Sequence, residues 1–286
     1  MTTTEPAPQR LPHRLAAEWR AGRMVWRREV IRFVRSRTQV LVSLLQPLLF
    51  LYVLGIGLSR LVAGSGGGGP AGREYLLFLF PGVLVMAAQG PAVSVGASIV
   101  WDRSSGFLRE MLAAPVLRGT LLLGKCLGGA TVATAQGAVV LLTAGLAGVP
   151  YRVDLFALLI GELVLAALAM TVLTALAAVV VRRAQAFNTV LTVLFTPLIF
   201  LSGLMFPISA MPPWMAALTL ANPLTYVVDG MRHTIAAHLG TPAGSTIFTP
   251  VTWAGWQVPA PVELATVLAF TTATLLLAAH HFTRRP

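Results

Sequence analysis

Charged residues are scarce in this chain: Asp, Glu, Lys and Arg together make up 11% of its 286 residues. A water-soluble domain usually carries about 25% charged residues. So little charge leaves too little polar surface to cover a soluble globule, which excludes an ordinary soluble enzyme or binding domain. The apolar residues fall in long runs and lack the alternation of barrel strands, so the sequence predicts an all-α integral membrane protein.

Cysteine is also nearly absent. The single Cys126 excludes an internal disulfide and any metal site built on cysteines. A cleavable signal peptide is not expected, because residues 1–37 are polar and Arg-rich with no apolar core of suitable length. The net charge of +11 does not indicate a nucleic-acid partner, since no basic stretch lies on a soluble domain.

The N-terminal part divides into a tail and a helix. Residues 1–12 are polar, contain three prolines and are predicted to be disordered. Residues 13–37 are predicted to form an amphipathic helix that lies in the membrane interface, with a packed soluble helix as the alternative. One stripe at helical spacing carries its apolar residues, namely Leu15, Trp19, Trp26, Val30 and Phe33.

Six segments are long and apolar enough to cross a bilayer, which takes about 20 residues. The predicted spans are 39–58, 75–101, 121–146, 155–181, 187–206 and 261–282. Residues 64–72 read GSGGGGPAG and are predicted to be a flexible loop. With six spans and both termini in the cytoplasm, 17 of the 21 basic residues lie on the cytoplasmic side, as the positive-inside rule requires.

Residues 207–259 are moderately apolar but are interrupted by prolines. The uninterrupted pieces 214–220 and 224–238 are too short to cross, so they are predicted to be extracellular re-entrant or interfacial helices. A seventh crossing is the alternative. It would place Arg284 and Arg285 outside, which favours six spans.

Residues 119–125 match the pattern of a phosphate-binding loop, G-x-x-x-x-G-K. Cys126 stands where that loop needs Ser or Thr, and no strand precedes it, so the sequence does not predict ATP binding by this chain. Lys125 is instead expected to extend to the cytoplasmic surface.

The loop at 102–118, between the second and third spans, is predicted to hold a short amphipathic helix. Ser104 or Ser105 can cap it, and Pro115 ends it. Its apolar face carries Phe107, Leu108, Met111 and Leu112. Such a helix can lie on the bilayer or insert into a groove of a soluble partner, and composition does not decide between the two.

This loop, with the GTLLLGKCLGG that follows, resembles the signature of the type-2 ABC exporter permease family. The matching positions are Asp102, Gly106, Leu108, Glu110, Leu112, Pro115, Gly124 and Lys125. FLSGLMFPISAMPPWM and NPLTYVVDGMR resemble the fifth span and the extracellular re-entrant part of the same family. The residues after Asp102 are closer to its drug-exporter and lipo-oligosaccharide-exporter branches.

The resemblance implies a membrane subunit of the bacterial plasma membrane, paired with itself or with a paralogous permease. Two separate ABC ATPase subunits would carry the ATP and Mg, and this chain would bind no cofactor or metal. The loop would be the coupling helix, with Asp102, Arg103, Gly106, Phe107, Leu108, Arg109, Glu110, Met111, Leu112 and Pro115 at the ATPase contact. The N-terminal helix would be the elbow, with Trp19, Trp26, Arg27, Arg28 and Phe33 contacting membrane lipid and the rest of the assembly.

Polar residues within the predicted spans are few. Glu162 is a functional candidate because burying a carboxylate in a membrane is costly, although it can also reach the outer interface. Gln46, Gln89 and Gln136 are expected to bond between helices, and Gly124 with Gly128 to permit close helix packing. The candidate substrate path is Gln46, Phe50, Glu162, Phe195, Phe200 and Met205.

In the re-entrant segment, Asp229 and His233 are four residues apart, which suits a metal pair. No third ligand stands out, so the sequence favours an Asp229–Arg232 ion pair with surface histidines. Asn222 and Pro223 are expected to turn the chain between two short helices. The residues singled out in this segment are Pro207, Trp214, Asn222, Pro223, Tyr226, Asp229 and Arg232.

Two other function classes remain as alternatives. A secondary transporter or channel would show ionisable residues at mid-membrane or matching broken helices in two halves. An intramembrane enzyme would need a nucleophile with a base, or a metal set, at one depth. Neither pattern is clear in the sequence, so a non-catalytic permease subunit is preferred.

Overall fold

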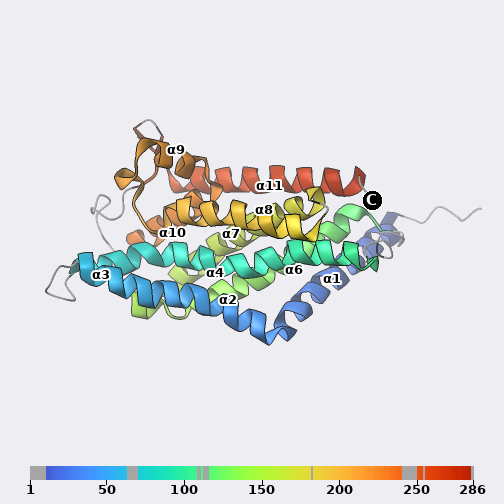
Figure 1. Ribbon diagram of the computed structural model, residues 1–286, viewed down its shortest axis with the longest axis horizontal. Coiled ribbons are helices and arrows are strands. Elements are labelled where there is room, and N and C mark those ends of the chain that lie inside the picture. Colours follow the sequence, from blue (N-terminus) through green and yellow to red (C-terminus); the bar gives the residue numbers. More distant parts are fainter. Residues whose placement is uncertain are drawn as a thin grey trace, which may run out of the picture.

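A computed structural model describes residues 11–62, 70–107, 111, 116–181, 183–239, 250–253 and 255–284. These residues form an elongated bundle of helices with one small hairpin at one end (Figure 1). The chain is therefore mostly helical, as the apolar runs predicted.

Most of the long helices run along the bundle. The first is α2 (Arg37–Leu49), which continues through the π-helical segment η1 (Phe50–Gly55) into α3 (Ile56–Val62). The others are α4 (Pro70–Ser104), α6 (Arg118–Leu141), α7 (Val153–Val180), α8 (Ala184–Ile199) and α11 (Ala260–Arg284). The irregular segment η4 (Phe200–Leu204) follows α8. A 3₁₀ turn, η3 (Ala144–Ala147), follows α6. Each of these long helical stretches overlaps a segment that the sequence predicted as a span.

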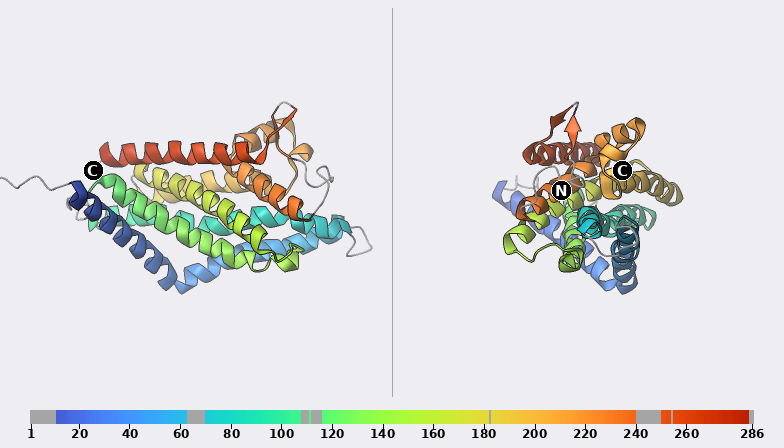
Figure 2. Two further views of the ribbon diagram at one scale, coloured as in Figure 1. Left: turned by 180° about the vertical axis from the view of Figure 1, so that it is seen from behind. Right: turned by 90° about the vertical axis from the view of Figure 1, so that its left-hand side faces the viewer.

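The central helices are α4 and α7, and the outer ones leave apolar side chains uncovered. Figure 2 shows the bundle from behind and end on. Leu41 on α2 and Leu276 on α11 are 68% and 65% exposed. Exposed apolar residues on outer helices are what a lipid-facing surface requires, whereas a soluble bundle would carry polar residues there.

Five of these helices are long and apolar enough to span a membrane: Arg37–Arg60, Gly72–Ser104, Val153–Val180, Ala184–Leu204 and Ala260–Thr283. The sequence predicted six. The helix that falls short is α6, because Lys125, Gln136 and several glycines dilute its apolar residues. Gln136 donates to the Ala87 carbonyl at 2.9 Å and accepts from the Ser43 hydroxyl at 3.0 Å, so it bonds between helices as expected.

The expected N-terminal helix is α1 (Leu11–Arg35), which packs obliquely along α6 (Figure 1). Its buried stripe is Val25, Glu29 and Phe33, spaced four residues apart. Leu15 and Trp19 are 69% and 75% exposed, so the predicted apolar stripe is covered only over its second half. Residues 1–10 lie outside the described part.

The segment after the fifth span contains η5 (Ile208–Ala210), α9 (Pro213–Ala221) and α10 (Pro223–Leu239). Pro207 precedes η5, and Pro213 and Pro223 each begin a helix, where a missing N–H costs nothing. Asn222 separates α9 from α10, and its side-chain oxygen accepts from the Leu224 N–H at 3.0 Å. Neither helix is a candidate span.

A two-stranded antiparallel hairpin, β1 (Thr252–Trp253) and β2 (Trp256–Gln257), precedes α11 and was not predicted. Trp253 donates to the Tyr226 hydroxyl at 3.0 Å, which attaches the hairpin to α10. Residues 240–249 and 254, which also belong to the expected re-entrant segment, lie outside the described part.

The loop after α4 turns at Gly106, whose φ of +79° suits glycine. Ser104 and Ser105 were expected to cap a following helix. Instead their hydroxyls donate back to the carbonyls of Trp101 and Asp102, at 2.9 and 3.4 Å. Phe107 and Met111 are described, whereas the expected coupling residues Leu108, Arg109, Glu110, Leu112 and Pro115 lie outside the described residues.

Candidate functional site

A buried charge cluster joins α1, α4 and α6 where α4 ends, and it consists of Arg28, Glu29, Ser98, Asp102 and Lys125. The Lys125 ammonium donates to Glu29 Oε1 at 2.9 Å, to Ser98 Oγ at 2.8 Å and to Asp102 Oδ2 at 2.6 Å. Arg28 donates to the other Asp102 oxygen, Oδ1, at 2.6 Å. Two acids meet two bases, so the cluster, called here the Lys125 network, is electrically balanced.

Lys125 was expected to reach the cytoplasmic surface, and that expectation is wrong. Its side chain is 1% exposed, and those of Glu29 and Asp102 are 5% and 3% exposed. The reason is the close approach of α1, which covers this part of α6. A Cβ on Gly124 would lie 2.8 Å from the Gly22 carbonyl, and one on Gly128 would lie 2.9 Å from Glu29 Cβ.

Glu29 and Ser98 were missed in the sequence because their partner lies far along the chain. Glu29 lies 96 residues from Lys125. One local signal was available: Glu29 falls four residues after Val25 and four before Phe33, on the apolar stripe of α1. An acidic residue on a buried stripe requires a buried cation.

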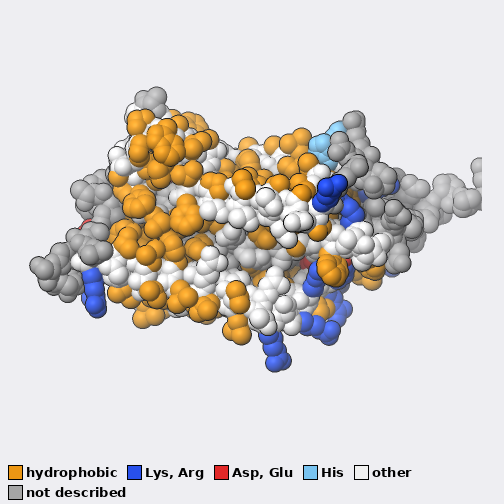
Figure 3. Space-filling model, viewed as in Figure 1, with side chains coloured by type: hydrophobic (Ala, Val, Ile, Leu, Met, Phe, Trp, Pro, Cys, Tyr) orange, Lys and Arg blue, Asp and Glu red, His pale blue; other side chains and the backbone are white. Residues whose placement is uncertain are grey.

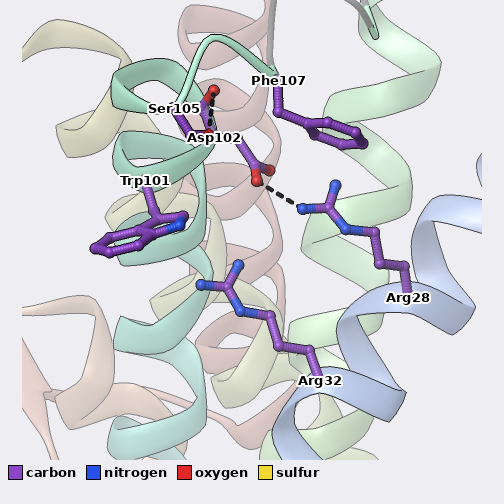
Figure 4. A pocket seen from close by; sticks show the side chains of 6 residues that line it. All are labelled: Arg28, Arg32, Trp101, Asp102, Ser105 and Phe107. Carbon is purple, nitrogen blue, oxygen red and sulfur yellow. Dashed lines mark hydrogen bonds and ion pairs between the residues drawn. The ribbon is translucent and has the colours of Figure 1, made fainter.

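Beside the network is an open cavity of about 580 Å³. Its lining is Arg28, Arg32, Trp101, Asp102, Ser105 and Phe107. Figure 4 shows Arg28 and Arg32 projecting from α1 toward the end of α4. The Arg28 guanidinium lies 4.6 Å from the centre of the Phe107 ring and donates to the Met111 sulfur at 3.4 Å. The first residues of the loop are therefore attached to α1.

The other expected elbow and loop residues are more dispersed. Trp26 donates to the Thr131 hydroxyl of α6 at 3.1 Å, Phe33 is buried, and Arg27 is exposed. Arg103 donates to the Val181 carbonyl at the end of α7 at 3.2 Å. Of the expected residues, Arg28, Asp102, Phe107 and Met111 come together at one place.

A second cavity, of about 1000 Å³, lies between α2, α4 and α8. Gln46, Phe50, Phe195 and Phe200, four of the six candidate path residues, line it. Most of its lining is apolar, with Gln46 and Gln89 among the polar side chains. Glu162 and Met205, the other two candidates, do not line it.

Both outer walls of this cavity depart from a regular α-helix three residues after a proline. Pro47 precedes η1 at Phe50, and Pro197 precedes η4 at Phe200. η1 is a π-helical segment, whereas η4 is a kink in which Leu201 has a ψ of 19° and Gly203 has a φ of +72°. Pro81 and Pro91, in contrast, lie inside α4 without such an irregular segment.

The expected Asp229–Arg232 ion pair is not formed. Asp229 accepts from the Val251 N–H at 2.8 Å. Arg232 is buried, donates to the carbonyls of Phe78 at 3.3 Å and Gly203 at 2.5 Å, and lies 3.7 Å from the centre of the Phe78 ring. Burial lowers the pKa of Arg232 to about 10, so its guanidinium stays charged at neutral pH.

The two histidines of α10 are not free surface residues either. His238 Nε2 lies 3.3 Å from Asp154, and His233 Nδ1 lies 3.7 Å from Glu263 Oε2. The Glu263 carboxylate raises the pKa of the His233 imidazole. Asp229, His233 and Glu263 could together hold a metal ion. The third member, Glu263, was missed because it lies in α11, beyond the hairpin.

Residues 21–236 match the family described as ABC-2 type transporter. The chain is 29% identical over 217 residues to the inner membrane transport permease YadH of Escherichia coli K12, covering 75% of this chain and 82% of that protein. It is 28% identical over 222 residues to nodulation protein J of Rhizobium meliloti, covering 76% and 79%. A putative transport permease, ycf38, of Cyanophora paradoxa is 26% identical over 216 residues, covering 72% and 71%. With its apolar helices and a family match over most of its length, this chain belongs to the ABC-2 type transporter permease family.

Proposed function

We propose that this chain is an exporter subunit that moves an amphiphilic drug-like, lipid or glycolipid substrate out of the cytoplasm or the inner leaflet. As an ABC-2 permease it is the membrane subunit of an ABC transporter, and such permeases work with an ABC ATPase. The direction, the substrate and the stoichiometry are the proposal. Two copies, or this chain and a paralogue, pair above two ATPase subunits that hold ATP and Mg. Family membership supports this transport subunit over a secondary transporter or an intramembrane enzyme.

The observation that carries the coupling part of the proposal is the Lys125 network. It connects α1, α4 and α6 directly beside Phe107, where the loop begins. A displacement of the loop by an ATPase is therefore transmitted to three helices together, because breaking a buried ion pair is costly. Phe107 is 40% exposed, which leaves part of its ring available to a partner.

The coupling role is tested by the double substitution Phe107→Asp plus Met111→Asp. We expect it to abolish co-purification with the partner ATPase and substrate-stimulated ATP hydrolysis. Leu117→Asp is the matched control, because Leu117 is 69% exposed at the far end of the same loop. Undiminished ATPase binding by the double variant would refute the coupling assignment.

The cavity between α2, α4 and α8 is the best candidate for a substrate path. Its walls are mainly apolar, with Gln46 and Gln89 as hydrogen-bonding groups, which suits a molecule with an apolar body and a small polar part. Val53 and Phe200 at its rim are 66% and 46% exposed, and a second permease is expected to cover this side. The π-helical segment η1 lies in one of these walls, and such segments often mark functional sites.

The proposed topology has six spans, with α6 as the additional one and both termini in the cytoplasm. Lys125 and Gln136 reduce its apolar character, and both have buried partners, so α6 exposes neither to lipid. The Lys and Arg side chains visible in Figure 3 gather mostly at the end of the bundle where α1 lies. The positive-inside rule assigns that end to the cytoplasm.

Cysteine accessibility tests this topology. The only native cysteine, Cys126, is buried, so Ser104→Cys introduces a single reactive reporter at the end of α4. We expect a membrane-impermeant thiol reagent to label it in inverted vesicles and not in intact cells. Labelling from outside only would overturn the orientation.

A further inference from the structure

Four ionisable side chains from three helices meet beside the re-entrant segment. Asp229 and His233 share one face of α10, Glu263 lies in the first turn of α11, and Glu162 comes from α7. Asp229, His233 and Glu263 each offer one possible ligand atom, and these three atoms lie within 4.8 Å of one another. Nothing in the proposed transport mechanism uses this group.

The carboxylate of Glu263 is in an unusual position. Its residue is 0% exposed, and neither of its oxygens has a hydrogen-bond partner among the described residues. His233 Nδ1 is also buried without a hydrogen bond, since its 3.7 Å distance to Glu263 Oε2 is too long for one. Buried polar groups are normally paired, so two such groups facing each other indicate a missing third component.

The protein's own cations do not supply that component. Arg232, the neighbouring guanidinium, is committed to the carbonyls of Phe78 and Gly203. Among the described residues, the ion-pair contact of the cluster is the long one between His233 and Glu263. One imidazole cannot balance the carboxylates that surround it.

Glu162 extends the cluster on the opposite side. Its Oε1 accepts from the Thr234 hydroxyl at 2.7 Å, whereas its Oε2 is buried and has no partner among the described residues. Gly230 lies between the two glutamates: a Cβ at this position would be 3.5 Å from Glu263 Oε2 and 3.9 Å from Glu162 Oε1. Both carboxylates therefore lie close to the backbone of α10 at Gly230.

We propose that Asp229, His233 and Glu263 bind one divalent transition-metal ion of the Zn²⁺ or Mn²⁺ type, with the Glu162 carboxylate nearby. One imidazole nitrogen with carboxylate oxygens suits these ions, whereas Mg²⁺ prefers oxygen ligands and several waters. Ligands of one tetrahedral ion lie about 3.4 Å apart when the bonds are about 2.1 Å long. Small side-chain rotations close the observed separation of up to 4.8 Å.

The surroundings support the ligands in the way that outer-shell groups do. The Val251 N–H holds Asp229, and the Thr234 hydroxyl holds Glu162. The His233 side chain is 36% exposed, which gives an ion a way in. A bound ion would cross-link α10 to α11, and would thereby fix the re-entrant segment on the bundle. This proposal does not rest on the proposed export function.

The test uses the full chain in lipid nanodiscs, with any affinity tag removed, stripped with EDTA and titrated with Zn²⁺. We expect one Zn²⁺ per chain by elemental analysis and calorimetry, and an increase in Tm on loading. Glu263→Gln and His233→Gln are each expected to weaken binding by at least about 10-fold. Asp154→Asn is the matched control, because Asp154 also lies near a histidine but its side chain is 52% exposed.

The wild-type titration is informative even where a variant does not fold. Failure of the wild-type chain to bind Zn²⁺ or Mn²⁺ would refute the proposal. So would binding that Asp154→Asn weakens as much as Glu263→Gln does, since that result describes adventitious surface binding. If Glu263→Gln raises the Tm and Zn²⁺ does not change the Tm of the wild-type chain, the cluster is held by shared protons instead of a metal ion.

Discussion

Replacing Lys125 by methionine removes the central cation of the Lys125 network and keeps most of the side-chain volume. Glu29 then keeps only the Ser98 hydroxyl, at 3.2 Å, and Asp102 keeps only Arg28. Breaking a buried ion pair by removing one partner costs about 3–5 kcal/mol. Lys125 has two such partners, but Arg28 still neutralises Asp102, so we expect a loss of about 3–5 kcal/mol and not twice that.

The assay is the free energy of unfolding in mixed micelles, measured for a double-mutant cycle. Glu29→Gln alone is expected to destabilise the protein, and Lys125→Met with Glu29→Gln to cost less than the two single changes together, by at least about 1 kcal/mol. Arg152→Met is the control, because its ion pair with Asp154 is exposed and is expected to contribute little. Additive effects in the cycle, or equal effects of Lys125→Met and Arg152→Met, would refute the buried network.

Two further substitutions test packing and the cavity walls. Gly124→Ala is expected to destabilise the protein by about 1–3 kcal/mol, because the new Cβ would meet an α1 carbonyl at 2.8 Å. Gly119→Ala on the same helix is the control, because its Cβ meets nothing within 4 Å. Equal unfolding free energies of the two variants would contradict this contact. Pro47→Ala removes the proline before η1 and is expected to lower substrate-stimulated ATP hydrolysis without loss of stability, with Pro81→Ala as the control. Unchanged stimulation would separate the π-helical segment η1 from transport.

The positions of the helices followed from the sequence because apolar length and proline are local signals. Five of the six predicted spans correspond to helices that are long and apolar enough to cross a membrane, and short helices lie on either side of Asn222. α6 is the instructive case. Its lysine and glutamine lower its apolar character, and their partners lie on other helices. A helix whose lysine and glutamine have buried partners therefore looks too polar to cross a membrane when only its own residues are considered.

The side-chain groupings did not follow, because each depends on residues that are distant in sequence. Glu263 reaches His233 only after the hairpin returns the chain to α10, and Glu29 reaches Lys125 only because α1 folds back over α6. The irregular segments η1 and η4 were missed for a different reason: a proline in a span predicts a distortion without specifying its type. Four of six candidate path residues line one cavity because both helices that carry them face it.

The Lys125 network also has a consequence for the order in which the chain enters the membrane. A lone lysine within a membrane-spanning helix is costly to insert, most of all near the helix centre. Glu29, Ser98 and Asp102 all precede Lys125 in the chain, so each is synthesised before α6 leaves the ribosome. The charge on α6 thus meets its counter-charges as it arrives. Because α6 depends on α1 and α4 for neutrality, a truncation that removes α1 would leave α6 as the helix that fails to insert.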